Sequence, residues 1–223
     1  MPERLRDQTP EPSVLLYDGR GPNPRVVRMF LHEKGLHLPM EQIDIVRGDN
    51  RSETFVSINP FATIPALRLD DGTILSDSVA ICRFMEDTFT DPDLMGRDAA
   101  ERAEITAWIR HIDASIVFPM TLGFRAAEGR TMFNGRVPLP PEGVGSDLKR
   151  IAAAELVAMN ARLSSRSYVC GERFTLADIV LFAFVRFGAS VGQPAPAGLS
   201  ALEDWTARMA ARPSAAASEA PGQ

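Results

Sequence analysis

Apolar positions along the first ninety residues follow the spacing of strands and helices in alternation. An apolar run at residues 13–17 predicts a buried strand, and residues 40–46 are a second strand candidate. Between them, apolar residues three and four positions apart predict a helix over residues 24–35. Pro24 suits the first turn of this helix, and Gly35 suits its C-terminal end.

The following stretch predicts a loop, a hairpin and a helix. Residues 48–60 are polar and predict a loop with one short helix, and short strands at 65–69 and 73–75 flank the turn sequence DDG. The sequence SDS at residues 76–78 offers capping side chains for a helix. The apolar face of that helix consists of Ile81, Phe84, Met85 and Phe89. Residues 13–90 thus predict a domain with helices on the faces of a sheet, parallel at its start and antiparallel in the hairpin.

The pattern changes at residues 90–98, where we place a domain boundary. Apolar positions beyond it recur at helical spacing, so residues 98–213 predict an all-helical second domain. A long loop rich in glycine and proline interrupts it at 128–146. Residues 1–12 are charged and rich in proline and predict a flexible arm, and residues 214–223 predict a disordered tail.

The sequence RFTLADIVLF carries the strongest local signal of the second domain. Thr175 and Asp178 have the spacing of a capping box, and Phe174 and Ile179 stand where a hydrophobic staple would. The helix that follows is apolar almost all round, which predicts that it lies buried at the centre of the domain.

Composition narrows the class of protein. The chain has 223 residues, of which 45% are hydrophobic and 24% charged, as in soluble globular proteins. No apolar run reaches the roughly 20 residues of a membrane span, and the start does not have the pattern of a secretory signal. Acidic and basic residues are spread along the chain with a formal net charge of −5, which disfavours nucleic acid as a partner.

The two cysteines and three histidines predict neither a redox centre nor a metal site. Cys82 and Cys170 lie far apart and outside any CxxC pattern, so we expect two reduced thiols in a cytoplasmic protein. Both suit packed or inert positions better than a catalytic role. His32, His37 and His111 are too scattered to ligate a metal together.

Three stretches together resemble the glutathione transferase (glutathione S-transferase) family. They are LYDGRGPNPRVVRMFLHEKGL, NPFATIPALRLDDGTILSDSVAICRFME, and YVCGERFTLADIVLF with WTARMAARPS. The resemblance covers Val14 to Pro213 and implies an α/β thioredoxin-like N-terminal domain followed by an all-α C-terminal helical domain. The sequence GPNP is similar to a fungal and bacterial subgroup of the family that lacks the usual Ser, Tyr or Cys, and Gly21 stands at that position here.

The resemblance implies a glutathione site on the first domain. Pro65 would be a cis proline, and the main chain of Ile64 would pair with the cysteinyl part of glutathione like an added strand. Asp77 would take the ammonium group of the γ-glutamyl end, and Ser78 its carboxylate, at the N-terminus of a helix. From the residues alone, Pro65 also fits an ordinary strand-initial proline, and Asp77 and Ser78 also fit simple helix caps.

Three further residues complete the expected contacts with glutathione. Asn50 and Arg51 match a family segment that reaches the glycine carboxylate, and Arg51 has the matching charge. A solvated loop charge explains Arg51 equally well. Asn23 is a candidate donor near the thiol, although shaping of the turn explains it slightly better.

The sequence leaves the group that activates the thiol unassigned. Gly21 offers no side chain, so the helix beginning near Pro24 is left to favour the thiolate through its dipole and free N–H groups, by about 0.3–1 kcal/mol. In the resembling subgroup a His and a Ser of the second domain hold a water molecule there, but residues 118–133 contain no histidine. Thr121 and Arg125 are the nearest polar candidates, and neither is assigned.

The activity that the resemblance implies is conjugation of glutathione to an apolar electrophile at the domain interface. The thiolate, stabilised by the first helix and a water molecule, would attack the electrophile in a transfer of an alkyl or aryl group. Glutathione is then a co-substrate, no metal is needed, and the protein is expected to be a cytoplasmic homodimer that serves detoxification, with neither nucleic acid nor membrane as a partner.

Other functions compete with this one. The main alternative is a non-catalytic protein that binds glutathione or hydrophobic ligands, because the usual activating side chain is missing. An interaction module of the same fold is disfavoured by Asp77 and Ser78. A glutaredoxin-like reductase is disfavoured by Gly21, which stands where that chemistry needs a cysteine.

Overall fold

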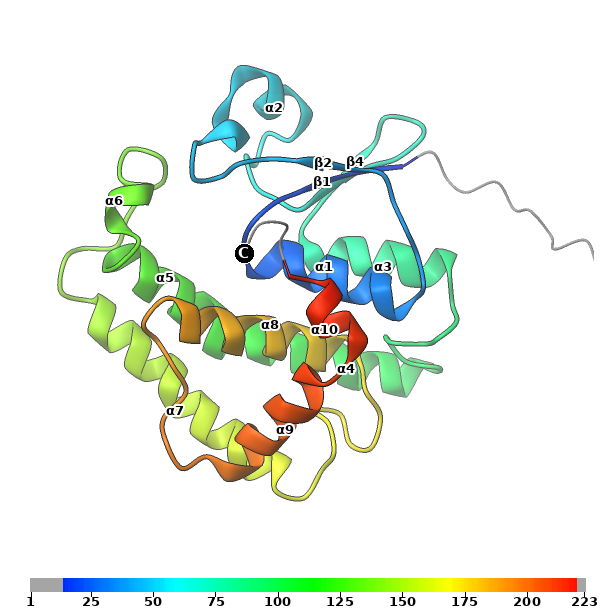
Figure 1. The fold of residues 1–223 in the computed structure, drawn as a ribbon, viewed down its shortest axis with the longest axis vertical. Coiled ribbons are helices and arrows are strands. Elements are labelled where there is room, and N and C mark those ends of the chain that lie inside the picture. The colour runs from blue at the N-terminus through cyan, green and yellow to red at the C-terminus, as the bar shows by residue number, and fades with distance from the viewer. Residues whose placement is uncertain (1–13, 220–223) are drawn as a thin grey trace, which may run out of the picture.

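The described part of the chain, residues 14–219 of a computed structural model, places a small sheet beside a larger group of helices (Figure 1). The expected arm at residues 1–12 lies outside the described part. The sheet has the strand order β2-β1-β3-β4. Its strands are β1 Leu15–Asp18, β2 Met40–Gln42, β3 Ala66–Arg68 and β4 Ile74–Ser76. The predicted parallel start and antiparallel hairpin are confirmed, because β2 is parallel to β1 while β3 is antiparallel to β1 and β4.

The second strand is shorter than the predicted residues 40–46. The carboxylate of Asp44 accepts hydrogen bonds from the main-chain N–H groups of Val46 and Arg47, and this turn takes the chain out of the sheet. Ile45 and Val46 therefore lie outside the strand ladder, where their carbonyl groups can meet another partner.

Three helices and a 3-10 turn belong to the first domain: α1 Pro22–Glu33, the turn Asp49–Arg51, α2 Glu53–Ile58 and α3 Ser78–Thr88. Helices α1 and α3 pack against each other on one side of the sheet, and α2 lies on the other side (Figure 1). Between β1 and α2 the rings of Tyr17 and Phe55 meet edge to face, with their centroids 5.6 Å apart. The sheet is thus covered on both faces around β1 and β3, which hold its buried residues, while β2 is exposed.

The first helix begins two residues before the predicted start, at Pro22, and ends where the sequence predicted. The main-chain N–H of Gly35 donates to the carbonyl of His32, and the N–H of Leu36 donates to the carbonyl of Leu31. This Schellman pattern needs a left-handed residue, and Gly35 has a φ of 67°. The helix is therefore stopped by local chemistry.

The second domain is helical throughout its described length. Its elements are α4 Ala99–Ile112, a π-helical turn Asp113–Val117, α5 Phe118–Ala126, α6 Arg130–Phe133, α7 Gly145–Leu163, α8 Leu176–Ser190, α9 Ser200–Ala210 and α10 Pro213–Ala217. Helix α8 packs against both α1 and α4, so it joins the two domains at the centre of the molecule (Figure 1). Among the described helices, none is long and apolar enough to cross a membrane.

The capping box that starts α8 is confirmed, and it reaches further than the sequence indicated. The carboxylate of Asp178 accepts hydrogen bonds from the N–H and hydroxyl of Thr175. It also accepts from the N–H of Val169 at 2.9 Å and from the indole N–H of Trp205 at 3.1 Å. One buried side chain therefore ties α8 to the preceding loop and to α9, and burial raises its pKa to about 6.

Two segments are more ordered than the sequence predicted. The stretch 128–146, predicted as a loop, contains α6 and the start of α7. The stretch 214–219, predicted as part of a disordered tail, continues α10 against α1. Ser214 and Arg212 bind the carboxylate of Glu33 there, and the carbonyl of Ser218 accepts from Arg28. These long-range polar contacts order the segment, and the sequence pattern does not show them.

Candidate functional site

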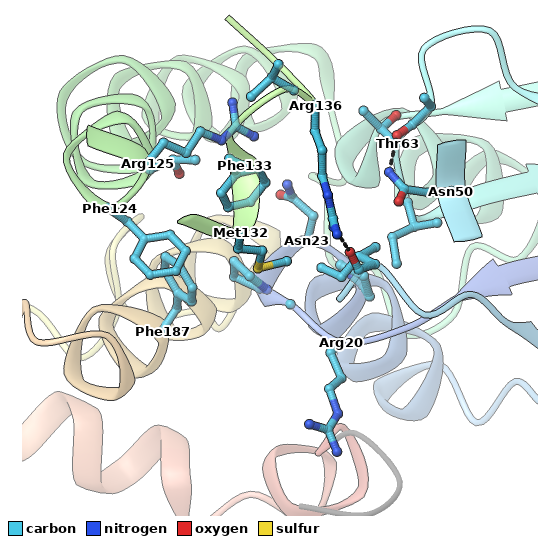
Figure 2. A pocket seen from close by; sticks show the side chains of 18 of the residues that line it. Arg20, Asn23, Asn50, Thr63, Phe124, Arg125, Met132, Phe133, Arg136 and Phe187 are labelled. Atoms are coloured by element: carbon cyan, nitrogen blue, oxygen red, sulfur yellow. Dashed lines mark hydrogen bonds between the residues drawn. The ribbon is translucent and has the colours of Figure 1, made fainter. Parts of the chain in front are cut away.

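A cavity of about 370 Å³ lies between the two domains. Its first-domain wall consists of the loop before α1 and segments near residues 45–51 and 62–64. Its second-domain wall comes from α5, α6, α8 and the residues that follow α6 (Figure 2). The cavity therefore lies where the sequence predicted an interface site.

Gly21 faces this cavity at the N-terminus of α1. It has a φ of 133°, in the region that favours glycine, and no side chain caps the helix. Pro22 and Pro24 carry no N–H, and the N–H of Arg25 already donates to the carbonyl of Gly21 at 3.2 Å. The first turn therefore offers an anion the N–H groups of Gly21 and Asn23, fewer donors than an ordinary helix start.

Ile64 lies beside this helix start with its main chain unpaired. The peptide bond between Ile64 and Pro65 is cis, as the resemblance implied. Within residues 14–219, neither the N–H nor the carbonyl of Ile64 makes a hydrogen bond. The side-chain amide of Asn59 holds the neighbouring carbonyl of Thr63 at 2.8 Å. The segment is thus fixed in place while its edge remains open to an extended ligand.

Asp77 and Ser78 do not line the cavity themselves, but Ser78 contacts Asn23, which does. Asp77 caps α3, because its carboxylate accepts from the N–H groups of Val79 and Ala80 at 2.9 and 3.0 Å. The buried hydroxyl of Ser78 lies 3.4 Å from the amide oxygen of Asn23. The starts of α1 and α3 are thereby joined, and the capping role of Asp77 is confirmed; the contacts of both residues with glutathione remain predictions.

Asn50 and Arg51 both line the cavity, but in different ways. The side-chain amide of Asn50 donates to the carbonyl of Ala62 at 2.6 Å, which leaves its oxygen for a ligand (Figure 2). The side chain of Arg51 is exposed at the rim and makes no hydrogen bond or ion pair within the described residues. Asn50 therefore has a structural role, whereas Arg51 is available to an anion.

The second-domain wall is aromatic. The ring of Phe124 meets the rings of Phe133 and Phe187 edge to face, at centroid distances of 6.1 and 5.5 Å. Met132 adds an adaptable apolar surface beside them (Figure 2). Sequence reasoning missed these residues. The apolar pair Met132 and Phe133 inside a polar stretch was the available signal.

The second-domain wall also contains the two polar residues that the sequence left as unassigned candidates for activating the thiol. Thr121 and Arg125 both line the cavity from α5. The guanidinium of Arg125 lies over the ring of Phe133, 5.0 Å from its centroid, and burial and the charge of Arg51 lower its pKa. No hydrogen bond within residues 14–219 satisfies its buried Nε atom.

Arg136 ties the two walls together. Its two terminal nitrogens donate to the carbonyls of Ile45 and Val46 at 2.8 and 3.0 Å. Figure 2 shows the side chain reaching across from the second domain. These are the carbonyls that the Asp44 turn leaves outside the sheet, so the short second strand and the closure of the cavity are connected.

The cysteines lie away from the cavity and are poorly ionised. Cys82 is buried in α3, and burial raises the pKa of its thiol well above the usual value. Burial also raises the pKa of Cys170 to about 12. Neither lines the cavity, so neither is placed to act as a nucleophile there. Among the described residues, no group of three or more His, Cys, Asp and Glu could hold a metal ion.

Asp113, in the π-helical turn, is expected to make stability depend on pH. Burial and the charge of Asp77 raise its pKa from 3.8 to about 6, against the opposing effect of Arg110. The carboxyl group thus favours folding only while protonated; this contribution is complete below about pH 4 and is lost as the pH rises through 6. Asp113→Asn should raise the free energy of unfolding by about 1 kcal/mol at pH 8 and leave it unchanged at pH 4. The figure for pH 8 is smaller than the full pKa shift implies, because solvent screens a partly exposed carboxyl group.

Urea unfolding at the two pH values measures this difference. Asp204→Asn, at an exposed position of α9, is the matched control and should have no effect at either pH. An equal effect of Asp113→Asn at both pH values would contradict the raised pKa.

Comparisons with known proteins agree with this geometry. The glutathione S-transferase N-terminal domain model matches residues 21–88, and the C-terminal domain model matches residues 146–213. The chain is 26% identical to glutathione S-transferase 2 of Saccharomyces cerevisiae, over 90% of this chain and 87% of that one. It is 27% identical to protein LigF of Sphingobium, over 87% of this chain and 88% of that one.

Solved structures show the same architecture. A glutathione S-transferase domain-containing protein of Marinobacter aquaeolei superposes with a TM-score of 0.85 at 32% identity, covering 90% of this chain and 99% of that one. The fold is therefore a thioredoxin-like domain followed by a helical one. By its sequence and its structure, this chain belongs to the glutathione S-transferase family.

Proposed function

We propose that the protein conjugates the thiol of glutathione to an apolar aromatic electrophile bound in the cavity. The observation that supports this most is the contrast between the two walls. Main-chain groups of Gly21, Asn23 and Ile64 line or border one side, and the rings of Phe124 and Phe133 line the other. A peptide thiol and an aromatic acceptor would meet between them.

Glutathione would lie along the first domain. Its cysteinyl main chain would pair with Ile64 beside the cis proline Pro65. Its γ-glutamyl carboxylate would accept from Ser78, and its ammonium group would lie near Asp77. Its glycine carboxylate would reach Arg51, with the free oxygen of Asn50 nearby. Asn50, Asp77 and Ser78 are already held by side-chain hydrogen bonds, whereas the main chain of Ile64 and the side chain of Arg51 are open to a ligand.

The reaction would be a nucleophilic attack by sulfur. The thiol loses its proton to solvent, the sulfur forms a bond to the electrophilic carbon, and a leaving group such as halide departs with its bonding electrons. The helix start would stabilise the thiolate by about 0.3–1 kcal/mol, which lowers the thiol pKa by less than one unit. A water molecule near the hydroxyl of Thr121 would supply a further donor. Most of the rate acceleration would therefore come from positioning.

Two alternatives have their own support. A protein that binds glutathione or hydrophobic ligands without turnover is favoured by the absence of a side-chain donor at Gly21. Cleavage of an aryl ether by the same thiolate is favoured by the aromatic wall and by the likeness to LigF, whose structure bears the name β-etherase. A cytoplasmic homodimer that serves detoxification is part of the main proposal.

The test is conjugation of glutathione to 1-chloro-2,4-dinitrobenzene, with calorimetric titration of glutathione in parallel. The proposal expects saturable binding and a rate well above the uncatalysed one. Binding without a rate above background would select the binding protein. No binding at millimolar glutathione would reject both.

Removal of the Ser78 hydroxyl should weaken the binding of glutathione about tenfold. A hydrogen bond to a charged group contributes about 1.5–3 kcal/mol, and the low end of that range corresponds to this factor. The calorimetric Kd of Ser78→Ala measures it. Ser165→Ala, at an exposed position outside the cavity, should leave the Kd unchanged. If the Kd of Ser78→Ala were unaltered, Ser78 would not contact glutathione, and its only role would be the contact with Asn23.

A further inference from the structure

Arg125 is a half-buried cation whose side chain makes no hydrogen bond to the described part of the chain. Its guanidinium rests over the ring of Phe133, and its Nε atom is buried without an acceptor within residues 14–219. A ring face compensates a buried cation only in part, because it leaves the N–H groups unpaired. The two terminal nitrogens are not buried in this way and make no hydrogen bond within the described residues, so they are the donors open to an anionic partner inside the cavity.

Two of the other three arginines that line the cavity, Arg136 and Arg51, have different surroundings. Arg136 donates to two carbonyls of the first domain. Arg51 stands at the first-domain rim, where the proposed function assigns it to the glycine carboxylate of glutathione. Figure 2 shows Arg125 on the opposite side from Asn50 and Thr63, reaching out from α5. Arg125 is thus the cation that faces the second substrate.

The described lining of the cavity contains no acidic side chain. Arg51 lies close enough for its charge, together with burial, to lower the pKa of Arg125. Four arginines, Arg20, Arg51, Arg125 and Arg136, line the cavity, and within the described residues no carboxylate lines it with them. A negatively charged ligand is favoured in such surroundings, and the aromatic wall favours a ring.

We propose that Arg125 makes the cavity selective for aromatic electrophiles that carry a carboxylate. This inference rests on the proposed function and names the class of its second substrate. The ring would lie among Phe124, Phe133 and Phe187, and the carboxylate would accept a pair of hydrogen bonds from the guanidinium. The chemistry is that of the proposed reaction: a carbon–sulfur bond forms at the ring, and halide leaves with its bonding electrons.

A matched pair of acceptors tests the selectivity. 4-Chloro-3,5-dinitrobenzoate and 4-chloro-3,5-dinitrobenzamide differ in the charge of one substituent. After division by the uncatalysed rate constants, kcat/KM of the unaltered protein should be about tenfold or more higher for the benzoate, as expected for hydrogen bonds between charged groups. Arg125→Gln should bring this ratio close to one and change kcat/KM for the benzamide less than threefold. Arg125→Lys should keep part of the preference.

Binding of the two conjugates gives a readout that does not need turnover. The glutathione conjugate of the benzoate should bind the unaltered protein about tenfold more tightly than that of the benzamide by calorimetry, and Arg125→Gln should remove the difference. Arg150→Gln, which removes an exposed cation of α7, should preserve both the ratio and the affinities.

The outcomes distinguish a loss of carboxylate selectivity from a loss of glutathione conjugation itself. Equal affinity for both conjugates in the unaltered protein, or a preference that survives in Arg125→Gln, would overturn the inference while leaving conjugation intact. Arg125→Gln could instead weaken the binding of glutathione as much as Arg51→Gln does. Arg125 would then bind a carboxylate of glutathione and not of the second substrate, and the inference would again be wrong. Failure to bind either conjugate or glutathione would overturn the proposed function together with it.

Discussion

Asp178→Ala is expected to lower the free energy of unfolding by about 3–5 kcal/mol. The substitution leaves the N–H groups of Val169 and Thr175 and the indole N–H of Trp205 without their acceptor. All three residues are buried, and each unsatisfied buried donor costs about 1–3 kcal/mol, with partial relaxation reducing the sum. The loss of the helix cap acts in the same direction. Urea unfolding followed by circular dichroism at pH 8, where this carboxyl group is ionised, measures the change.

Two further variants identify the cause. Asp178→Asn keeps the shape of the side chain but places an NH₂ group opposite N–H donors, which it cannot accept from. Its free energy of unfolding should therefore fall between those of the unaltered protein and the alanine variant. Asp147→Ala removes an exposed acid from the first turn of α7 and should cost less than 1 kcal/mol. A loss below 1 kcal/mol in Asp178→Ala would mean that water replaces the carboxylate, and the argument from buried donors would be wrong.

Arg28→Met is expected to cost about 3–5 kcal/mol of stability and to weaken glutathione binding. Arg28 donates to the carboxylate of Asp18 at 2.6 Å, to the carbonyl of Gly19 at 3.0 Å and to the carbonyl of Ser218 at 2.9 Å. Without it, the fully buried Asp18 keeps the amide of Gln42 as its hydrogen-bond donor. An uncompensated buried carboxylate is the main source of the expected loss.

The effect on binding follows from the position of Asp18 and Gly19, directly before the loop that carries Gly21. Gly19 packs closely against Ile43 and Ile64, since a Cβ atom there would lie 2.4 Å from the carbonyl oxygen of Ile43 and 2.6 Å from the side chain of Ile64. Freed from Arg28, this stretch should lose the alignment of Gly21 with Ile64 that the proposed function requires. Calorimetric titration with glutathione measures the change in Kd.

The double variant Arg28→Met with Asp18→Asn separates lost packing from an unpaired charge. It should recover a large part of the stability, because the buried carboxylate is then absent. Arg102→Met, at an exposed position of α4, is the control for loss of an arginine. If the double variant were no more stable than Arg28→Met, the charge of Asp18 would not be the cause.

The sequence was most informative where local chemistry decides the structure. Gly35 ends α1, and Thr175 and Asp178 form the capping box of α8, and both features involve neighbouring residues. The first-domain wall was anticipated differently, from the resemblance to the family, which also implied the cis bond before Pro65. The end of β2 was missed because the side chain of Asp44, and not the apolar pattern, determines where the chain turns.

The second-domain wall could not be anticipated in the same way. Phe124, Phe133 and Phe187 lie on three helices and meet through tertiary packing alone. Arg136 was one charge in a stretch rich in glycine and proline, and its partners lie about ninety residues earlier in the chain. Periodicity assigns such residues to elements but does not say which of them share a cavity.

The two walls differ in how they can change. A substitution by any residue except proline alters a side chain but leaves the backbone amides at Gly21 and Asn23 in place, so these two donors persist. The opposite wall consists of side chains, among them the aromatic rings and the guanidinium groups of Arg125 and Arg136, each of which one substitution can remove. Substitutions within residues 118–137 can therefore change which electrophilic substrates are preferred, while the main-chain contacts with glutathione stay the same.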